Sequence, residues 1–173
     1  MKYQIPIGVS DFAEIRKNEY YYVDKTALIE ELLKTSAVKV TLITRPRRFG
    51  KTIGMSMLSS FFDIRKDSRE LFEGLHVAED TSLCQEWMNQ WPTIFLTFKK
   101  VDGLNFDSAY EMLASVMADL FNEHSYLLQD ERISAYDREM LERIMNASAS
   151  MTELKNSLSL MTRVMQIHYG KSV

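Results

Sequence analysis

The sequence predicts an α/β fold, because strand-like and helical segments alternate along its 173 residues. Two apolar runs rich in β-branched or aromatic residues, 38–44 and 93–98, predict buried strands. Segments with apolar residues at helical spacing lie between these runs and fill the remainder of the chain. The order strand, helices, strand, helices is that of an α/β domain with a helix-rich C-terminal half.

Each predicted helix has a start signal or a periodic apolar stripe. Asp24 is a suitable N-cap for a helix over residues 25–34. A second helix begins near Gly50 and runs to about Asp63, because apolar residues recur along it at helical spacing. These two helices flank the first predicted strand.

Capping boxes predict the next helical starts. Residues 67–70 and 82–85 each have the N-cap and N3 pairing of such a box, so two short helices are expected there. Three apolar stripes follow within residues 110–169 and predict longer helices. Ser150 and Glu153 predict the cap of the last one.

Composition limits the class of protein. With 46% hydrophobic and 26% charged residues, the chain is expected to form one globular domain. The net charge of −3 argues against a surface coated for nucleic acid. The single cysteine, Cys84, cannot form an internal disulfide and lacks metal-site spacing. Neither a signal peptide nor an apolar stretch of about 20 residues is found, so we expect a cytoplasmic protein without a membrane partner.

Residues 44–52 read TRPRRFGKT and connect the first predicted strand to the next helix. In a phosphate-binding loop, backbone N–H groups surround the phosphates, a lysine reaches the β and γ oxygens, and a Ser or Thr hydroxyl binds Mg²⁺. Lys51 and Thr52 are predicted to have these last two roles. The usual motif has two glycines, and here only Gly50 remains, with Arg45 at the position of the first.

The predicted ligand is ATP, or less favourably GTP, bound together with Mg²⁺. The positive end of the helix that begins near Gly50 would face the phosphates, with basic side chains beside it. The candidate nucleotide-binding residues are Arg47, Arg48, Phe49, Gly50, Lys51, Thr52 and Ile53. Thr52 is also the candidate metal ligand, and no catalytic residue is assigned.

Several segments together resemble the N-terminal region of the AAA-ATPase-like family. The matching segments are residues 5–12 (IPIGVSDF), 15–16, 20–26 (YYYVDKT), 42–52 (LITRPRRFGKT), 56–58, 61–63, 70–75 and 169–171. An arginine in place of the first glycine is usual in that family. The resemblance implies a three-layer P-loop NTPase domain, often joined to a C-terminal nuclease-like domain of the PD-(D/E)XK type, and it places residues 22–25 near the base or ribose.

The resemblance also implies a motif that this sequence lacks. The family's next element would be the Walker B strand with its acidic pair, which completes Mg²⁺ binding, and it should begin at about Val173. Lys99 and Lys100, not acids, follow the second predicted strand. We therefore expect nucleotide binding without hydrolysis, and one partial domain: residues 1–37 an N-terminal arm and helix, residues 38–173 an incomplete P-loop core.

Alternative readings stay open at this point. Two predicted strands that are not neighbours would leave backbone groups unpaired, so we expect a homodimer through open edges or completion by a missing C-terminal region. Basic residues could instead bind nucleic acid or polyphosphate, with Phe49 as a stacking ring. These basic residues are Arg45, Arg47, Arg48, Lys51, Arg65 and Lys66. A third reading is an inactive fragment that docks the rest of its own domain.

Overall fold

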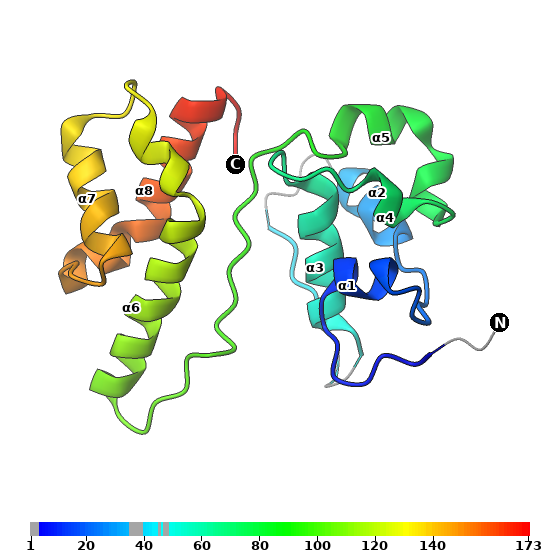
Figure 1. Cartoon of the computed structure of the whole chain (residues 1–173), viewed down its shortest axis with the longest axis horizontal. Coiled ribbons are helices and arrows are strands. Elements are labelled where there is room, and N and C mark those ends of the chain that lie inside the picture. Colours follow the sequence, from blue (N-terminus) through cyan, green and yellow to red (C-terminus); the bar gives the residue numbers. More distant parts are fainter. Residues whose placement is uncertain (1–3, 35–39, 45, 47–48) are drawn as a thin grey trace. The chain divides into compact units, whose positions relative to one another are not determined.

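The computed structural model describes residues 4–34, 40–44, 46 and 49–173. Within these residues the chain forms helices joined by turns and irregular segments (Figure 1). Its elements are α1 (Phe12–Lys17), α2 (Ala27–Lys34), α3 (Lys51–Phe62), α4 (Arg69–Phe72), η1 (His76–Glu79), α5 (Thr81–Trp87), α6 (Phe106–Glu123), η2 (Ser125–Gln129), α7 (Ala135–Met145) and α8 (Met151–Tyr169), where η marks a 3₁₀ helix. They form two compact units, Met1–Thr93 and Ile94–Val173.

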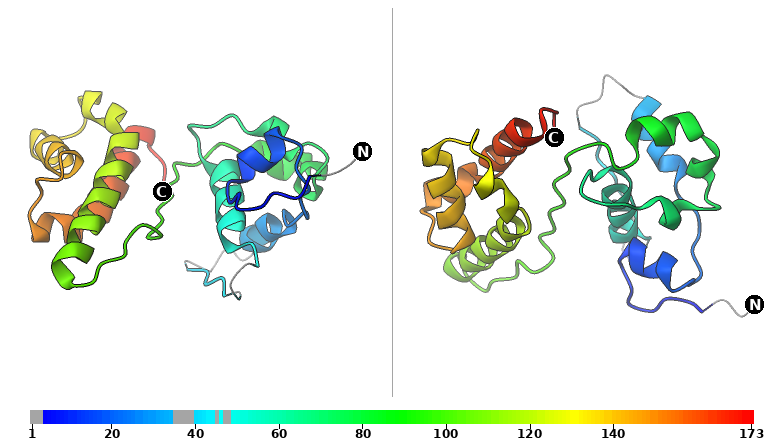
Figure 2. Two further views of the ribbon diagram at one scale, coloured as in Figure 1. Left: turned by 60° about the horizontal axis from the view of Figure 1, so that its bottom comes forward. Right: turned by 45° about the horizontal axis from the view of Figure 1, so that its top comes forward.

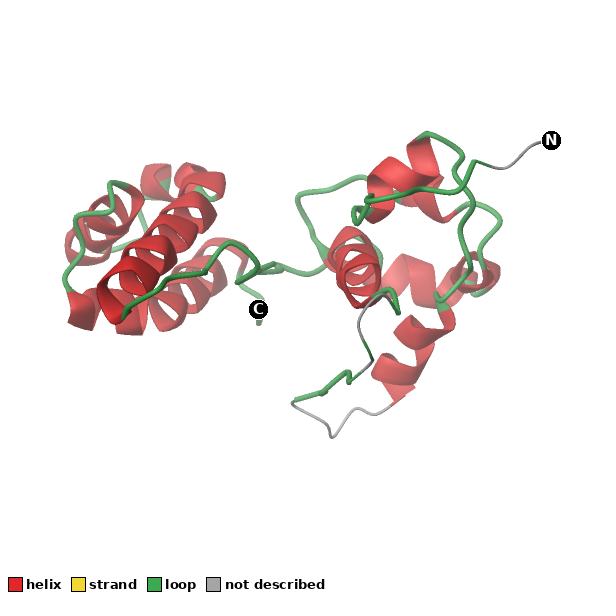
Figure 3. Ribbon diagram, turned by 90° about the horizontal axis from the view of Figure 1, so that it is seen from below, coloured by secondary structure: helices red, strands yellow, loops and turns green. Residues whose placement is uncertain are grey.

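The predicted α/β three-layer fold is wrong. The part of the chain that the structure describes contains helices but no β-strand and no sheet, as the colouring of Figure 3 shows. Its β-type pairing is limited to an isolated parallel bridge between Asp63 and Trp91. The family-derived expectation of a sheet-centred core is therefore corrected to helical packing within each unit.

The two predicted strands fail for lack of a neighbour. A strand needs an adjacent strand to pair its backbone N–H and C=O groups, whereas a helix pairs them internally. Described residues 40–44 and 94–98 belong to no regular element. Val40 and Leu42 are 83% and 85% exposed, while Ile94 and Leu96 pack against the helical core of the second unit.

The core of the first unit is built on aromatic side chains from α1, α3 and α4. Phe12, Phe61 and Phe72 are fully buried. The ring centroid of Phe72 lies 5.0 Å from that of Phe12 and 5.3 Å from that of Phe61. Ser56 Oγ, also buried, accepts a 3.0 Å hydrogen bond from the Phe12 N–H. These contacts hold α3 in place through its C-terminal half.

The second unit is a helical cluster in which α6 packs against α7 and α8 (Figure 2). Its core includes Phe121, Ile144, Met161 and Met165, which are almost completely buried. The apolar stripes predicted for the C-terminal half coincide with these helices. Methionine lacks branching and fits irregular gaps, which suits a core formed by helices that meet along uneven surfaces.

The predicted helix caps were partly correct. At α8, the Ser150 hydroxyl accepts from the Glu153 N–H and the Glu153 carboxylate accepts from the Ser150 N–H, so that capping box is confirmed. Short helices also form near the two other predicted boxes, but with different caps. Asp80, not Ser82, caps α5 by accepting from the Leu83 N–H.

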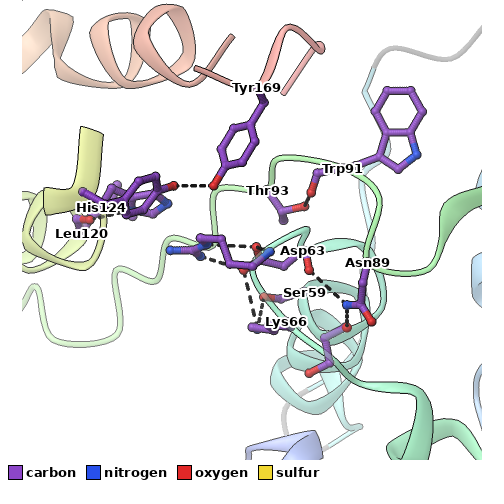
Figure 4. Close-up of polar contacts among 12 residues, drawn as sticks. Ser59, Asp63, Lys66, Asn89, Trp91, Thr93, Leu120, His124 and Tyr169 are labelled. Carbon is purple, nitrogen blue, oxygen red and sulfur yellow. Dashed lines mark hydrogen bonds and ion pairs between the residues drawn. The ribbon is translucent and has the colours of Figure 1, made fainter. Parts of the chain in front are cut away.

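Asn89 secures the C-terminal end of α3 (Figure 4). Its amide nitrogen donates to the backbone oxygens of Ser60 and Asp63 at 3.1 and 3.0 Å, and its side-chain oxygen accepts from the Ser68 N–H at 3.0 Å. Its φ of 56° lies in the left-handed region, which asparagine tolerates better than most residues. The nearby Asp63 carboxylate is buried and is bound at both oxygens by Arg65.

Asn89→Ala is expected to lower the free energy of unfolding by about 2–4 kcal/mol, because buried partners lose their bonds and alanine is strained at positive φ. Urea denaturation followed by far-UV circular dichroism measures the change. The control is Asn18→Ala, which removes a single exposed bond to the Glu14 carbonyl and should cost under about 1 kcal/mol. Equal losses in the two variants would contradict the role given to Asn89.

Asp130 joins the end of η2 to the end of α8 in the second unit. Its Oδ2 lies 2.7 Å from His168 Nδ1 and 2.6 Å from Arg132 Nη2. Arg132 also donates to the His168 carbonyl oxygen at 2.9 Å. The side-chain hydrogen bonds from Arg132, aided by its backbone N–H and by His168, hold the pKa of Asp130 well below its usual value.

A carboxyl group whose pKa is lower in the folded than in the unfolded chain stabilises the fold fully above the unfolded value near 4, and this stabilisation is lost as the pH falls further. Asp130→Asn should therefore melt below the wild type at neutral pH, with a difference that shrinks below about pH 4. Melting temperatures between neutral and acid pH test this. Asp119→Asn, at an exposed surface pair with Lys100, should show little difference at any pH.

Candidate functional site

The first turn of α3 begins at a glycine in the left-handed conformation. Gly50 is the N-cap, with φ 74° and ψ 20°, and its carbonyl accepts the first helical hydrogen bond from the Gly54 N–H at 2.9 Å. No side chain caps the helix, and its first turn carries no acidic residue. Within this turn no carboxylate offsets the partial positive charge of the helix start, whereas Glu31 of α2 lines the pocket beside it.

The sequence-predicted residues that the structure describes gather at this turn. Lys51 and Thr52 are exposed in the first turn of α3, beside Phe49, which is 63% exposed. Ile53 is half-buried. Arg47 and Arg48, together with Arg45, lie outside the described residues. An exposed lysine and an exposed hydroxyl next to an uncapped helix start can bind an anion and its counter-cation.

A pocket of about 470 Å³ opens beside Gly50. This volume lies within the usual range of small-molecule sites. The described residues that line it are Lys25, Leu28, Glu31, Ile43, Phe49, Gly50, Lys51, Gly54 and Met55. The pocket is thus mostly apolar and contains two lysines and one carboxylate.

Lys25 enters this pocket from the segment before α2. Its Nζ donates a long hydrogen bond, 3.4 Å, to the Phe49 carbonyl oxygen. A Cβ atom added to Gly50 would lie only 2.9 Å from this Nζ. The resemblance placed residues 22–25 near a base or ribose, and in the structure Lys25 contacts the loop that precedes α3.

Tyr22, from the same run, belongs to the core. Its ring packs edge-on against Phe12 with centroids 5.3 Å apart, and its hydroxyl donates to the Met57 sulfur at 3.6 Å. Burial raises the pKa of Tyr22 to about 12. The hydroxyl is therefore a structural contact and stays protonated at neutral pH.

Asp24 and Thr26 hold the backbone on both sides of Lys25. Asp24 accepts from the N–H and hydroxyl of Thr26 at 2.8 and 2.7 Å, and from the His76 N–H at 2.8 Å. The fully buried Thr26 hydroxyl accepts from the Val77 N–H at 3.1 Å. Partial burial alone would raise the pKa of Asp24, but the combined hydrogen bonds hold it below its usual value.

Two residues of the predicted basic run lie away from the pocket. Arg65 and Lys66 follow the C-terminal end of α3, a 12-residue helix about 18 Å long that begins at Lys51. Arg65 forms an ion pair with Asp63 at 2.7 Å, and Lys66 Nζ donates to Ser59 Oγ at 3.0 Å. The fold therefore separates these cations from Lys51 and uses them at the opposite end of the helix.

The described part of the chain holds no group of three or more His, Cys, Asp or Glu side chains suited to a metal ion. Cys84 is a free thiol whose pKa is raised by burial.

None of the helices between residues 4 and 173 that the structure describes combines the length and the apolar character needed to cross a bilayer.

Sequence reasoning found the start of α3 but missed the other pocket walls. Leu28 and Glu31 come from α2, and Met55 from the second turn of α3. The helical pattern of α2 indicated which residues share a face. It could not indicate that this face lies against the Gly50 loop, because that depends on contacts between distant segments.

Gly50→Ala is expected to destabilise the fold by about 1–2 kcal/mol, since alanine is strained at the positive φ of this position, while the flexible Lys25 side chain can move away from the added Cβ. Gly54→Ala is the matched control in the same helix. No atom lies within 4 Å of its added Cβ, so helix propensity should stabilise it by up to about 1 kcal/mol. Urea denaturation should give opposite signs, and two losses of equal size would contradict the description of Gly50.

Comparison with known proteins identifies the family. Residues 6–173 match the family described as Predicted AAA-ATPase. An uncharacterized protein in the vnfD 5′ region of Azotobacter chroococcum mcd 1 is 33% identical over 96 residues, which cover 55% of this chain and 17% of that protein. The chain thus spans less than a fifth of this relative's length. No solved structure matches this chain. Because the family match includes almost every residue, the chain belongs to the predicted AAA-ATPase family.

Proposed function

We propose that this chain binds ATP together with Mg²⁺, with the phosphates at the first turn of α3. The observation that carries the proposal is the left-handed Gly50 N-cap followed by exposed Lys51 and Thr52, where Gly50 and Lys51 line a pocket of about 470 Å³. Membership of an ATPase-like family supports a nucleotide as the ligand.

The roles of the residues follow from their chemistry. Backbone N–H groups at the start of α3 would donate to phosphate oxygens, which the helix dipole favours. The Lys51 ammonium would bind the β and γ phosphates. Phe49 and Ile53 flank these groups in sequence, and Arg47 and Arg48 are proposed from the sequence alone to add positive charge.

Thr52 fits the proposed Mg²⁺. The ion prefers oxygen ligands and keeps several waters, so the Thr52 hydroxyl would supply one oxygen ligand to an ion that the phosphates and water also hold. Thr52 is exposed and adjacent to Lys51, which allows its hydroxyl to reach an ion carried by the phosphates. Mg²⁺ would neutralise phosphate charge when bound.

The rest of the pocket suits a purine. Leu28, Ile43 and Met55 provide apolar surface against which a flat ring can pack. These contacts do not discriminate between purine bases, so they do not separate ATP from GTP.

Hydrolysis is not part of the proposal. Among the described lining residues, Glu31 is the acidic one, and it stands on α2 rather than at the end of a strand. Phosphoryl transfer needs positioned metal and water as well as bound phosphate. We therefore propose nucleotide binding by these residues and no hydrolytic step.

Calorimetric titration of Mg-ATP into the 173-residue chain tests the proposal. Wild type is expected to bind saturably, and Lys51→Ala should weaken binding at least tenfold, because one ammonium–phosphate contact is lost. Lys155→Ala removes an exposed lysine from α8 in the second unit and should leave the affinity within twofold.

The nucleic-acid alternative is tested on the same preparations. A single-stranded oligonucleotide should bind weakly, with an affinity that falls steeply as salt is raised. Tight oligonucleotide binding without any response to Mg-ATP would contradict the nucleotide proposal. Unchanged Mg-ATP affinity in Lys51→Ala would also contradict it, provided that the variant shows the wild-type circular dichroism spectrum.

A further inference from the structure

We propose that Lys25 is a second phosphate-binding lysine of the nucleotide site. This inference rests on the proposed function and adds to it a cation from outside the Gly50–Lys51–Thr52 segment. It assigns the segment before α2 to the triphosphate, where the family resemblance pointed to the base or ribose.

The position of the Lys25 ammonium supports this role. Its Nζ lies beside Gly50, where a Cβ atom added to the glycine would be 2.9 Å from it. It lines the same pocket as Lys51. Two lysines, one before α2 and one in the first turn of α3, thus line the pocket beside the glycine at which the helix begins.

The present partner of Lys25 is one that a phosphate can replace. The ammonium has three donors, and its hydrogen bond to the Phe49 carbonyl oxygen is long, at 3.4 Å. A phosphate oxygen offers a charged acceptor, for which hydrogen bonds are shorter and about twice as strong. Lys25 is exposed, so it can turn toward a ligand without leaving a buried position.

The backbone of Lys25 is fixed in advance. Asp24 and Thr26 are tied to each other and to the N–H groups of His76 and Val77 at the start of η1. Ligand binding therefore has to order only the lysine side chain, which lowers the entropic cost of the contact. Asp24 and Thr26 act here as positioning residues that do not touch the ligand.

The decisive probe is Mg-tripolyphosphate, which carries the phosphates of ATP but neither base nor ribose. Lys25→Met should weaken binding of Mg-tripolyphosphate and of Mg-ATP by the same factor, about tenfold, as expected for loss of one charge-assisted contact. Lys17→Met, another exposed lysine of the first unit, is the matched control and should stay within twofold for both probes. Lys25→Arg keeps the positive charge and should retain most of the affinity.

Each outcome of the titrations has a distinct meaning. Equal losses with the two probes support phosphate binding by Lys25. Loss for Mg-ATP alone would overturn it in favour of a base or ribose contact. Unchanged affinity in Lys25→Met, with binding lost in Lys51→Ala, would overturn this inference and leave the proposed function standing. A folded wild-type chain that binds neither probe would overturn both.

A stability measurement excludes a purely structural role. If Lys25 served only to hold the Phe49 carbonyl, Lys25→Met would lower the urea midpoint and leave both affinities unchanged. The inference requires the opposite pattern, with a midpoint like that of Lys17→Met and weaker binding. Thr26→Val keeps the shape of the side chain but removes its hydroxyl, and it should weaken both probes less than Lys25→Met does.

Discussion

The anchoring of α3 by its buried C-terminal half is the constraint on which the first unit depends. Phe61 packs in the aromatic core, Ser56 binds the backbone of α1, and Asn89 secures the end of the helix. With these contacts in place, Lys51 and Thr52 at the start of the helix stay exposed. The contacts that orient α3 are therefore made by its C-terminal half, while the groups suited to bind an anion lie at its N-terminal end.

The second constraint on the pocket is the hydrogen-bonded segment before α2. Asp24 and Thr26 connect this segment to η1, so that two parts of the chain about 50 residues apart support the same short stretch of backbone. Lys25, between them, is directed at the loop before α3. The pocket thus owes its shape to contacts that are local in space but distant in sequence, which is why helical periodicity alone could not reveal it.

The charges of the described residues support the proposal of a small anionic ligand. Lys25 and Lys51 face one pocket, whereas Arg65 and Lys66 are engaged at the opposite end of α3. A polynucleotide is best bound by cations along a continuous track. Lys25 and Lys51, the described cations near Gly50, instead line one pocket, which supports the proposed nucleotide ligand.

The sequence by itself determined the local features of this protein: the helix from Lys51, the capping box at Ser150, the methionine-rich stripes of the C-terminal half and the family. These depend on neighbouring residues or on a recognisable motif. Only the tertiary structure decided that residues 40–44 and 94–98 do not pair into a sheet, and that Lys25 meets Gly50. A strand and a pocket both need segments from elsewhere in the chain. An apolar pattern indicates that a segment tends to be buried, but it does not indicate which segment will pack against it.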